Sequence, residues 1–120
     1  MNSEDLKKRT KKFAKDVIIF YDDLPKGRRS TEIIAKQQIR SASSVSANYR
    51  SACKGRSKPE FISKLNIAEE AADESNYWLE LMNELEIAKG DLIQNLIKES
   101  KEITAIITSS GRTAKLSIKK

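Results

Sequence analysis

Apolar side chains recur every three or four residues along most of the chain, which is the spacing of one face of an α-helix. A first helix is predicted over residues 4–24, and Pro25 with Gly27 ends it. Its late part, residues 17–21, is apolar nearly all round rather than along one stripe, so a second buried contact is predicted there. The apolar positions of this helix are Leu6, Phe13, Val17, Phe20 and Leu24.

A second helix is predicted over residues 31–54, where Ser30 or Thr31 can cap its start and Gly55 can end it in a left-handed conformation. Its inward rows carry mostly small side chains, which let two helix backbones approach closely. This helix is therefore predicted to be central. Asn48 lies on an inward row, where its amide needs a partner and could fix the register between helices.

A third helix is predicted over residues 58–89, because Ser57 and Glu60 form a capping box around Pro59. After Gly90 a fourth helix is predicted over residues 92–110, stopping near Gly111. Residues 112–120 are basic and weakly patterned, which predicts a loosely ordered tail. Four amphipathic helices with short connections predict an all-α fold, an antiparallel up-down-up-down four-helix bundle, as one domain over residues 1–111.

Charge is distributed unevenly along the 120 residues, whose formal net charge is +6. Residues 1–64 carry 16 basic and 7 acidic side chains, whereas residues 65–110 carry 3 and 10. A basic first half and an acidic second half can neutralise each other within or between subunits, or the basic part can face a polyanion.

The cations of the second helix share one outward stripe, which continues into the loops at both ends of that helix. A row of guanidinium and ammonium groups can follow a nucleic-acid backbone by replacing its condensed counterions. The alternative is a solvated face, or one paired with acids from another helix or subunit. No aromatic residues alternate with these cations, so a phosphate contact without base stacking is predicted. The candidate nucleic-acid-binding residues are Arg28, Arg29, Lys36, Arg40, Arg50, Lys54, Arg56 and Lys58.

Catalytic, metal and cofactor sites are not predicted for this chain. It has no histidine, which a di-metal site in a helix bundle requires in its Glu-x-x-His pairs, and the single Cys53 has no base to activate it. The acidic residues of the third helix are expected to carry surface or inter-subunit charge. One cysteine allows no internal disulfide, and no stretch is apolar enough to span a membrane or serve as a secretion signal, so a cytoplasmic location is predicted.

The segments QIRSASSVSANYRSA, RSKPEFISKLNIAEEAADES and YWLELM resemble the bacterial 23S rRNA intervening-sequence protein family, also called four helix bundle proteins. The resemblance implies an antiparallel bundle that forms a homo-oligomer, with a ring of five as the known form. Some members are encoded within intervening sequences of rRNA genes, and a related group serves diversity-generating retroelements. It therefore implies RNA or DNA as a ligand and a reverse transcriptase as a candidate protein partner.

The chain departs from the commoner family pattern at Ser46, where proline or glycine often stands, and at residues 49–52, where an Ile-Ala-Glu-Gly type sequence is frequent. The second change removes an acid and adds Arg50 to the basic stripe. We therefore predict a non-enzymatic, oligomeric bundle that binds RNA or DNA. The alternative is a protein-binding scaffold or assembly module, in which the acidic face of one subunit docks on the basic face of the next.

Overall fold

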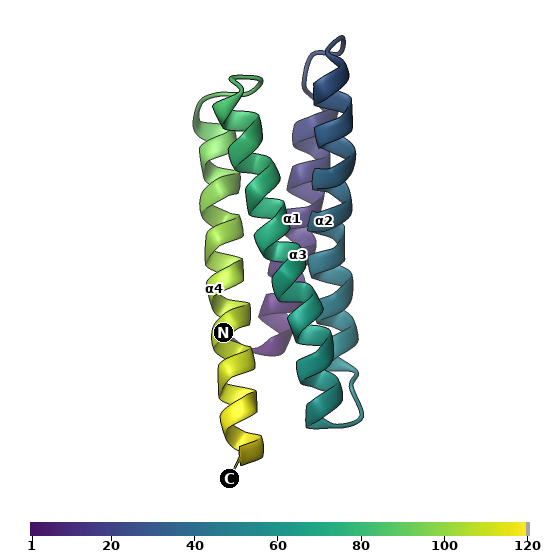
Figure 1. Cartoon of the computed structure of the whole chain (residues 1–120), viewed down its shortest axis with the longest axis vertical. Coiled ribbons are helices and arrows are strands. Elements are labelled where there is room, and N and C mark those ends of the chain that lie inside the picture. The colour runs from purple at the N-terminus through teal and green to yellow at the C-terminus, as the bar shows by residue number, and fades with distance from the viewer. Residues whose placement is uncertain (120) are drawn as a thin grey trace.

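Four α-helices build the computed structural model, which describes residues 1–119, with side chains up to Ser117. Successive helices run antiparallel and pack in the ring order α1, α2, α3, α4 (Figure 1). The contact between α2 and α3 is the most extensive, and that between α1 and α4 is the smallest. The predicted all-α, antiparallel up-down-up-down four-helix bundle is confirmed. The helices are α1 (Ser3–Asp22), α2 (Arg29–Cys53), α3 (Lys58–Glu84) and α4 (Asp91–Lys119).

The third helix ends at Glu84, five residues before its predicted end at residue 89. Glu86 adopts a left-handed φ of 59°, and the N–H groups of Glu86 and Ile87 donate to the carbonyls of Asn83 and Met82. This pattern is a Schellman stop, which usually places glycine where Glu86 stands. Because residue 86 is not glycine, the sequence gives no stop signal there, and the end of the third helix was predicted just before Gly90.

The fourth helix continues through Gly111 to Lys119, so its predicted end at residue 110 is wrong. A Cβ atom on Gly111 would lie 3.4 Å from Cδ2 of Leu65, which places this glycine where α4 passes close to α3. Ala114 is buried one turn later, and the Lys58 ammonium donates to the Ser117 hydroxyl. Residues 112–119, predicted as a loose tail, are therefore the last turns of α4, and residue 120 lies outside the described residues.

Two predictions about the ends of α2 are also wrong. Neither Ser30 nor Thr31 caps its start, because Arg28 is the N-cap residue and its side chain makes no capping bond. Gly55 is not left-handed, but a Cβ atom there would lie 3.0 Å from the Ala52 carbonyl oxygen. The absence of a side chain therefore permits a close backbone approach rather than a turn of special handedness.

One of the two hydrogen bonds of the capping box predicted at the start of α3 is confirmed. The Ser57 hydroxyl accepts from the Glu60 N–H at 3.2 Å. The Glu60 carboxylate, however, accepts from the N–H of Arg56 and not from that of Ser57. The side chains of Ser57 and Glu60 thus accept hydrogen bonds from backbone N–H groups in the α2–α3 connection and in the first turn of α3.

Small side chains fill the interface between α2 and α3, as the sequence predicted. One buried polar pair crosses this interface, since the Gln38 amide donates to the Ser75 hydroxyl. Asn48 instead donates to the carbonyl and hydroxyl of Ser44 on its own helix, so it does not set the register between helices. The small residues that are buried on these two helices include Ser41 and Ala42 of α2 and Ala68, Ala72 and Ser75 of α3.

Tyr21 places a hydroxyl in the core with no hydrogen-bond partner among the described residues. Replacing Tyr21 with phenylalanine removes this unpaired group, so we expect the free energy of unfolding in urea to rise by about 1 kcal/mol. Burial also raises the pKa of Tyr21 above its ordinary value. Ionisation of this phenol therefore leaves the free energy of unfolding unchanged below pH ~10 and lowers it as the pH rises further.

The Tyr21→Phe protein should consequently lose less stability than the unmodified protein between pH 9 and pH 12, roughly the range in which phenols ionise. Circular dichroism during urea titration measures both effects. A destabilised Tyr21→Phe protein would contradict the assignment, because it would mean that the hydroxyl is paired in solution.

Candidate nucleic-acid interface

All eight predicted contact residues have exposed side chains, but the bundle does not bring them together. Arg28 and Arg29 stand at the start of α2, whereas Arg56 and Lys58 follow its end. A helix of 25 residues is about 37 Å long, so these two pairs lie at opposite ends of the bundle. The predicted site therefore divides into two groups, with Lys36 and Arg40 between them.

Among the side chains that the structure describes, Arg40 is the one member of the stripe on α2 whose charge is balanced by an acid. Its guanidinium bonds to the Glu74 carboxylate of α3 and, at 3.2 Å, to the Gln37 amide oxygen. Glu74 also accepts from the Trp78 indole N–H at 2.9 Å. Pairing with another helix, the alternative considered for the whole stripe, thus holds for Arg40 and leaves it a weaker candidate for a phosphate contact.

Six exposed cations gather at the end of the bundle that holds the α2–α3 connection and the last turns of α4 (Figure 1). The bond from Lys58 to Ser117 fixes the end of α4 beside the start of α3. Among the side chains up to Ser117, none of the six takes part in an ion pair. We call this group the basic end: Arg50, Lys54, Arg56, Lys58, Arg112 and Lys115.

The start of α1 adds a further cation to this region. Lys7 pairs with Glu4 at 2.9 Å, and this bond raises the pKa of Lys7. The positive charge of Arg50 on α2 acts in the opposite direction on the pKa of the same amine. Glu4 offsets Lys7, whereas Arg50 keeps its charge unbalanced among the described residues.

Sequence reasoning missed Arg112 and Lys115 because it ended the fourth helix at Gly111. The signal was present in the sequence, since Ile103, Ile107 and Ala114 keep the helical spacing across the glycine. An interior glycine costs a helix about 1 kcal/mol relative to alanine. Gly111 lies where α4 passes close to Leu65, and packing of this kind is not visible in one sequence.

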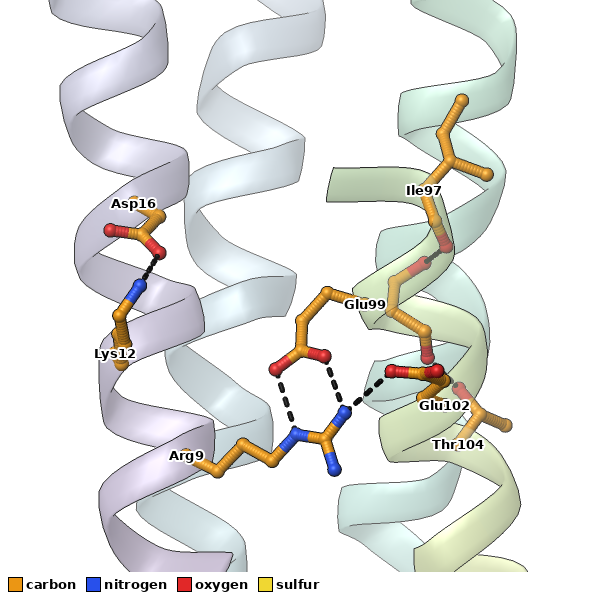
Figure 2. Close-up of polar contacts among 8 residues, drawn as sticks. Arg9, Lys12, Asp16, Ile97, Glu99, Glu102 and Thr104 are labelled. Carbon is orange, nitrogen blue, oxygen red and sulfur yellow. Dashed lines mark hydrogen bonds and ion pairs between the residues drawn. The ribbon is translucent and has the colours of Figure 1, made fainter. Parts of the chain in front are cut away.

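Arg9 joins α1 to α4 and is unavailable for phosphate binding. Figure 2 shows its guanidinium held by two carboxylates of α4. The Arg9 Nε and Nη2 atoms donate to Glu99 at 2.8 and 2.5 Å, and Nη2 also donates to Glu102 at 2.7 Å. These bonds, above all those to Glu99, raise the pKa of Arg9. Arg9 therefore has a structural role at the smallest helix contact of the bundle.

The acidic residues of α3 also hold helices together, although they were expected to be surface charge. Glu69 accepts from the Thr108 hydroxyl at 3.0 Å, and Glu80 lies 3.6 Å from the Lys101 ammonium. With Glu74 on Arg40, three of these carboxylates contact a neighbouring helix. All three remain at least partly exposed.

An apolar groove of about 540 Å³ lies between α1 and α4, beyond the Arg9 contact. Ile19 is 55% exposed and Leu92 is 72% exposed at its walls. Its acidic members are Asp16, Asp23 and Glu99, of which Asp16 pairs with Lys12 and Glu99 with Arg9. The remaining lining residues are Lys12, Phe20, Leu24, Asn95 and Leu96.

Within the described part of the chain, no group of three histidine, cysteine, aspartate or glutamate residues is arranged to hold a metal ion. None of the described helices combines the length and the apolar character needed to cross a membrane.

These features define a small all-α bundle with a group of six exposed cations at one end of its long axis. Residues 3–109 match the 23S rRNA-intervening sequence proteins, and the chain belongs to this family. A crystal structure of a protein of unknown function from the S23 ribosomal protein family, from Bacteroides thetaiotaomicron VPI-5482, has the same fold. The two share 31% sequence identity with a TM-score of 0.82, over 93% of this chain and 99% of that chain. No protein of curated function matches this chain.

Proposed function

We propose that this protein is a non-enzymatic, oligomeric bundle of the bacterial cytoplasm that binds RNA or DNA through its basic end. The observation that carries the proposal is that Arg50, Lys54 and Arg56 are exposed, adjacent along the chain and without an acidic partner among the described residues. Such cations displace the counterions of a phosphate backbone without reading its sequence. The family name, which refers to the intervening sequences of 23S rRNA, agrees with RNA as the ligand.

Arg28 and Arg29 form a second, separate group of cations at the other end of α2, and Lys36 lies between the two groups. Asp22 and Asp23 close α1 on the other side of the short connection to α2, so acids accompany these cations. We therefore assign the main contact to the basic end and a secondary one to this group. Titration of the unmodified protein with RNA at several salt concentrations tests the proposal, because phosphate contacts make affinity fall steeply with salt.

An oligomer, with a ring of five as the form that the family implies, is supported by the apolar groove between α1 and α4. Ile18 and Ile19 belong to the segment predicted to need a second buried contact, and both are exposed in the single chain. In the protein-scaffold alternative, the acidic face of one subunit docks on the basic face of the next. In that case high salt should dissociate the assembly, whereas apolar contacts should persist.

Replacing Ile19 with aspartate should lower the mass of the assembly measured by light scattering, because a carboxylate would be buried at the subunit contact. Ile33 is a matched control, since both isoleucines are 55% exposed and Ile33 lies on α2, outside the groove. The Ile33→Asp protein should keep the mass of the unmodified protein. An Ile19→Asp protein of unchanged mass would show that the groove is not the subunit contact.

A further inference from the structure

The outward face of α1 is a row of lysines that ends in an exposed isoleucine. Lys8, Lys11 and Lys15 follow one another at helical spacing, and their side chains are exposed. None of the three takes part in an ion pair among the described side chains. Ile18 continues the row toward the end of the helix. Because residues 7–15 contain six cations and no acid, this face is strongly positive.

The outward face of α3 carries the opposite charge around an exposed aromatic ring. Asp73, Tyr77 and Glu84 stand on this face at helical spacing, and all three are exposed. Neither carboxylate takes part in an ion pair among the described side chains. Residues 65–84 contain six acids and no cation. Tyr77 packs edge-on against Trp78, with ring centroids 5.0 Å apart, and exposed aromatic side chains are enriched at protein contacts.

The two faces point to opposite sides of the bundle. Within the described chain α1 and α3 do not contact each other, because they are diagonal in the ring order of the four helices. Both run in the same direction, since successive helices are antiparallel (Figure 1). When two copies stand side by side with parallel axes, α1 of one copy can therefore meet α3 of the next, and these two helices run parallel.

Contacts inside one chain fix the height of one face relative to the other. Arg9 on α1 donates to Glu99 on α4. The next residue of α4, Ser100, donates its hydroxyl to Asn76 on α3 at 2.8 Å. Arg9 and Asn76 therefore lie at similar heights along the bundle. Because both helices rise about 1.5 Å per residue in the same direction, each position of α1 is level with the position of α3 about 67 residues later in the sequence.

Opposite charges are level with each other on the two faces. The heights of Lys8 and Asp73 differ by two residues, which is about 3 Å along the axis. The heights of Lys15 and Glu84 differ by the same amount. A lysine side chain is longer than this difference, so both lysines can reach a carboxylate of a neighbouring copy.

Apolar and aromatic side chains complete the match. Ile18 is level with Leu85, and both are exposed in the single chain. Lys11 stands one residue from the height of Tyr77, whose ring face attracts an ammonium group. A cation–π contact and an apolar contact can therefore accompany the two ion pairs.

We infer that the outward face of α1 docks on the outward face of α3 of a second copy of this chain, with lysines against carboxylates and Ile18 against Leu85. The inference rests on the oligomer of the proposed function and names its contact. Because the two surfaces differ, the contact is head-to-tail and can repeat from copy to copy until the assembly closes. The six cations of the basic end belong to neither face, so they remain available to nucleic acid.

Charge reversal tests this contact by light scattering over a range of protein concentrations at roughly 0.1 M salt. The Lys8→Glu, Lys15→Glu variant and the Asp73→Lys, Glu84→Lys variant should each assemble about a hundredfold more weakly, because like charges replace opposite ones. The variant that carries all four changes has the net charge of the unmodified protein and should recover its mass. An equimolar mixture of the two double variants should also assemble, since the acidic α1 of one meets the basic α3 of the other.

A matched control is available on α2. Arg29 and Lys36 are exposed and seven residues apart, as are Lys8 and Lys15, and they lie on neither face. The Arg29→Glu, Lys36→Glu variant should keep the mass of the unmodified protein. Circular dichroism checks that each variant keeps its helices.

Two results would overturn the inference while leaving the oligomer intact. One is an unchanged mass for both double variants. The other is a loss of mass that neither the four changes together nor the mixture restores. If the unmodified protein scatters light as a single chain at every concentration, the oligomer of the proposed function fails and the inference fails with it.

Discussion

Replacing Arg50 and Lys54 with glutamate is expected to weaken nucleic-acid binding by about a hundredfold at 0.1 M salt. Both side chains are exposed, and neither has an acidic partner among the described residues, so their full charge is available to phosphates. Losing two contacts alone costs roughly 25- to 60-fold at that salt concentration, and the new carboxylates add repulsion. The slope of log affinity against log salt should flatten by about 1.4 to 1.8.

The Lys89→Glu, Lys98→Glu protein is the matched control, because it has the same change in net charge at the opposite end of the bundle. It should keep at least a third of the unmodified affinity, since charges about 30 Å away are largely screened at physiological salt. If the two double variants lose affinity equally, net charge governs binding and the basic end is not a defined contact surface.

Replacing Ala42 with leucine is expected to lower the free energy of unfolding by about 3 kcal/mol. Ala42 is fully buried on the inward face of α2, directly after the buried Ser41. Leucine is a good helix former, so the loss would come from forcing two closely packed helices apart and not from helix propensity. Urea denaturation followed by circular dichroism measures it.

Ala47 provides the control on the same helix, because its side chain is exposed. Ala47→Leu should change the free energy of unfolding by no more than about 0.5 kcal/mol. A value that small for Ala42→Leu as well would mean that the packing of α2 in the core does not depend on a small side chain at this position.

The sequence was sufficient to predict four helices and their antiparallel order, because helical spacing and connections of a few residues leave few alternatives. It was less informative wherever tertiary packing overrides a local preference. Glu86 occupies a position that glycine usually takes, and Gly111 lies inside a helix that glycine usually ends. In both places the neighbouring structure determines the conformation.

The sequence was sufficient to predict which cations of the candidate site are exposed, but not how the fold arranges them. All eight cations are exposed as expected, yet the length of α2 separates Arg28 from Arg56, and Glu74 balances Arg40. Contacts between distant segments, such as Arg40 with Glu74 or Lys58 with Ser117, depend on helix packing that one sequence does not specify. For the same reason, the contribution of Arg112 and Lys115 to the basic end became visible only in the folded chain.

The central claim is that the basic end binds a phosphate backbone, and a salt titration of the unmodified protein tests it most directly. Fluorescence would follow binding of a structured rRNA fragment and of a DNA duplex between roughly 50 and 300 mM salt. We expect affinity in the micromolar range or tighter, with a log–log slope near −3, as about four contacts would give. Absence of binding to either nucleic acid at the lowest salt concentration would contradict the claim and favour the protein-scaffold alternative.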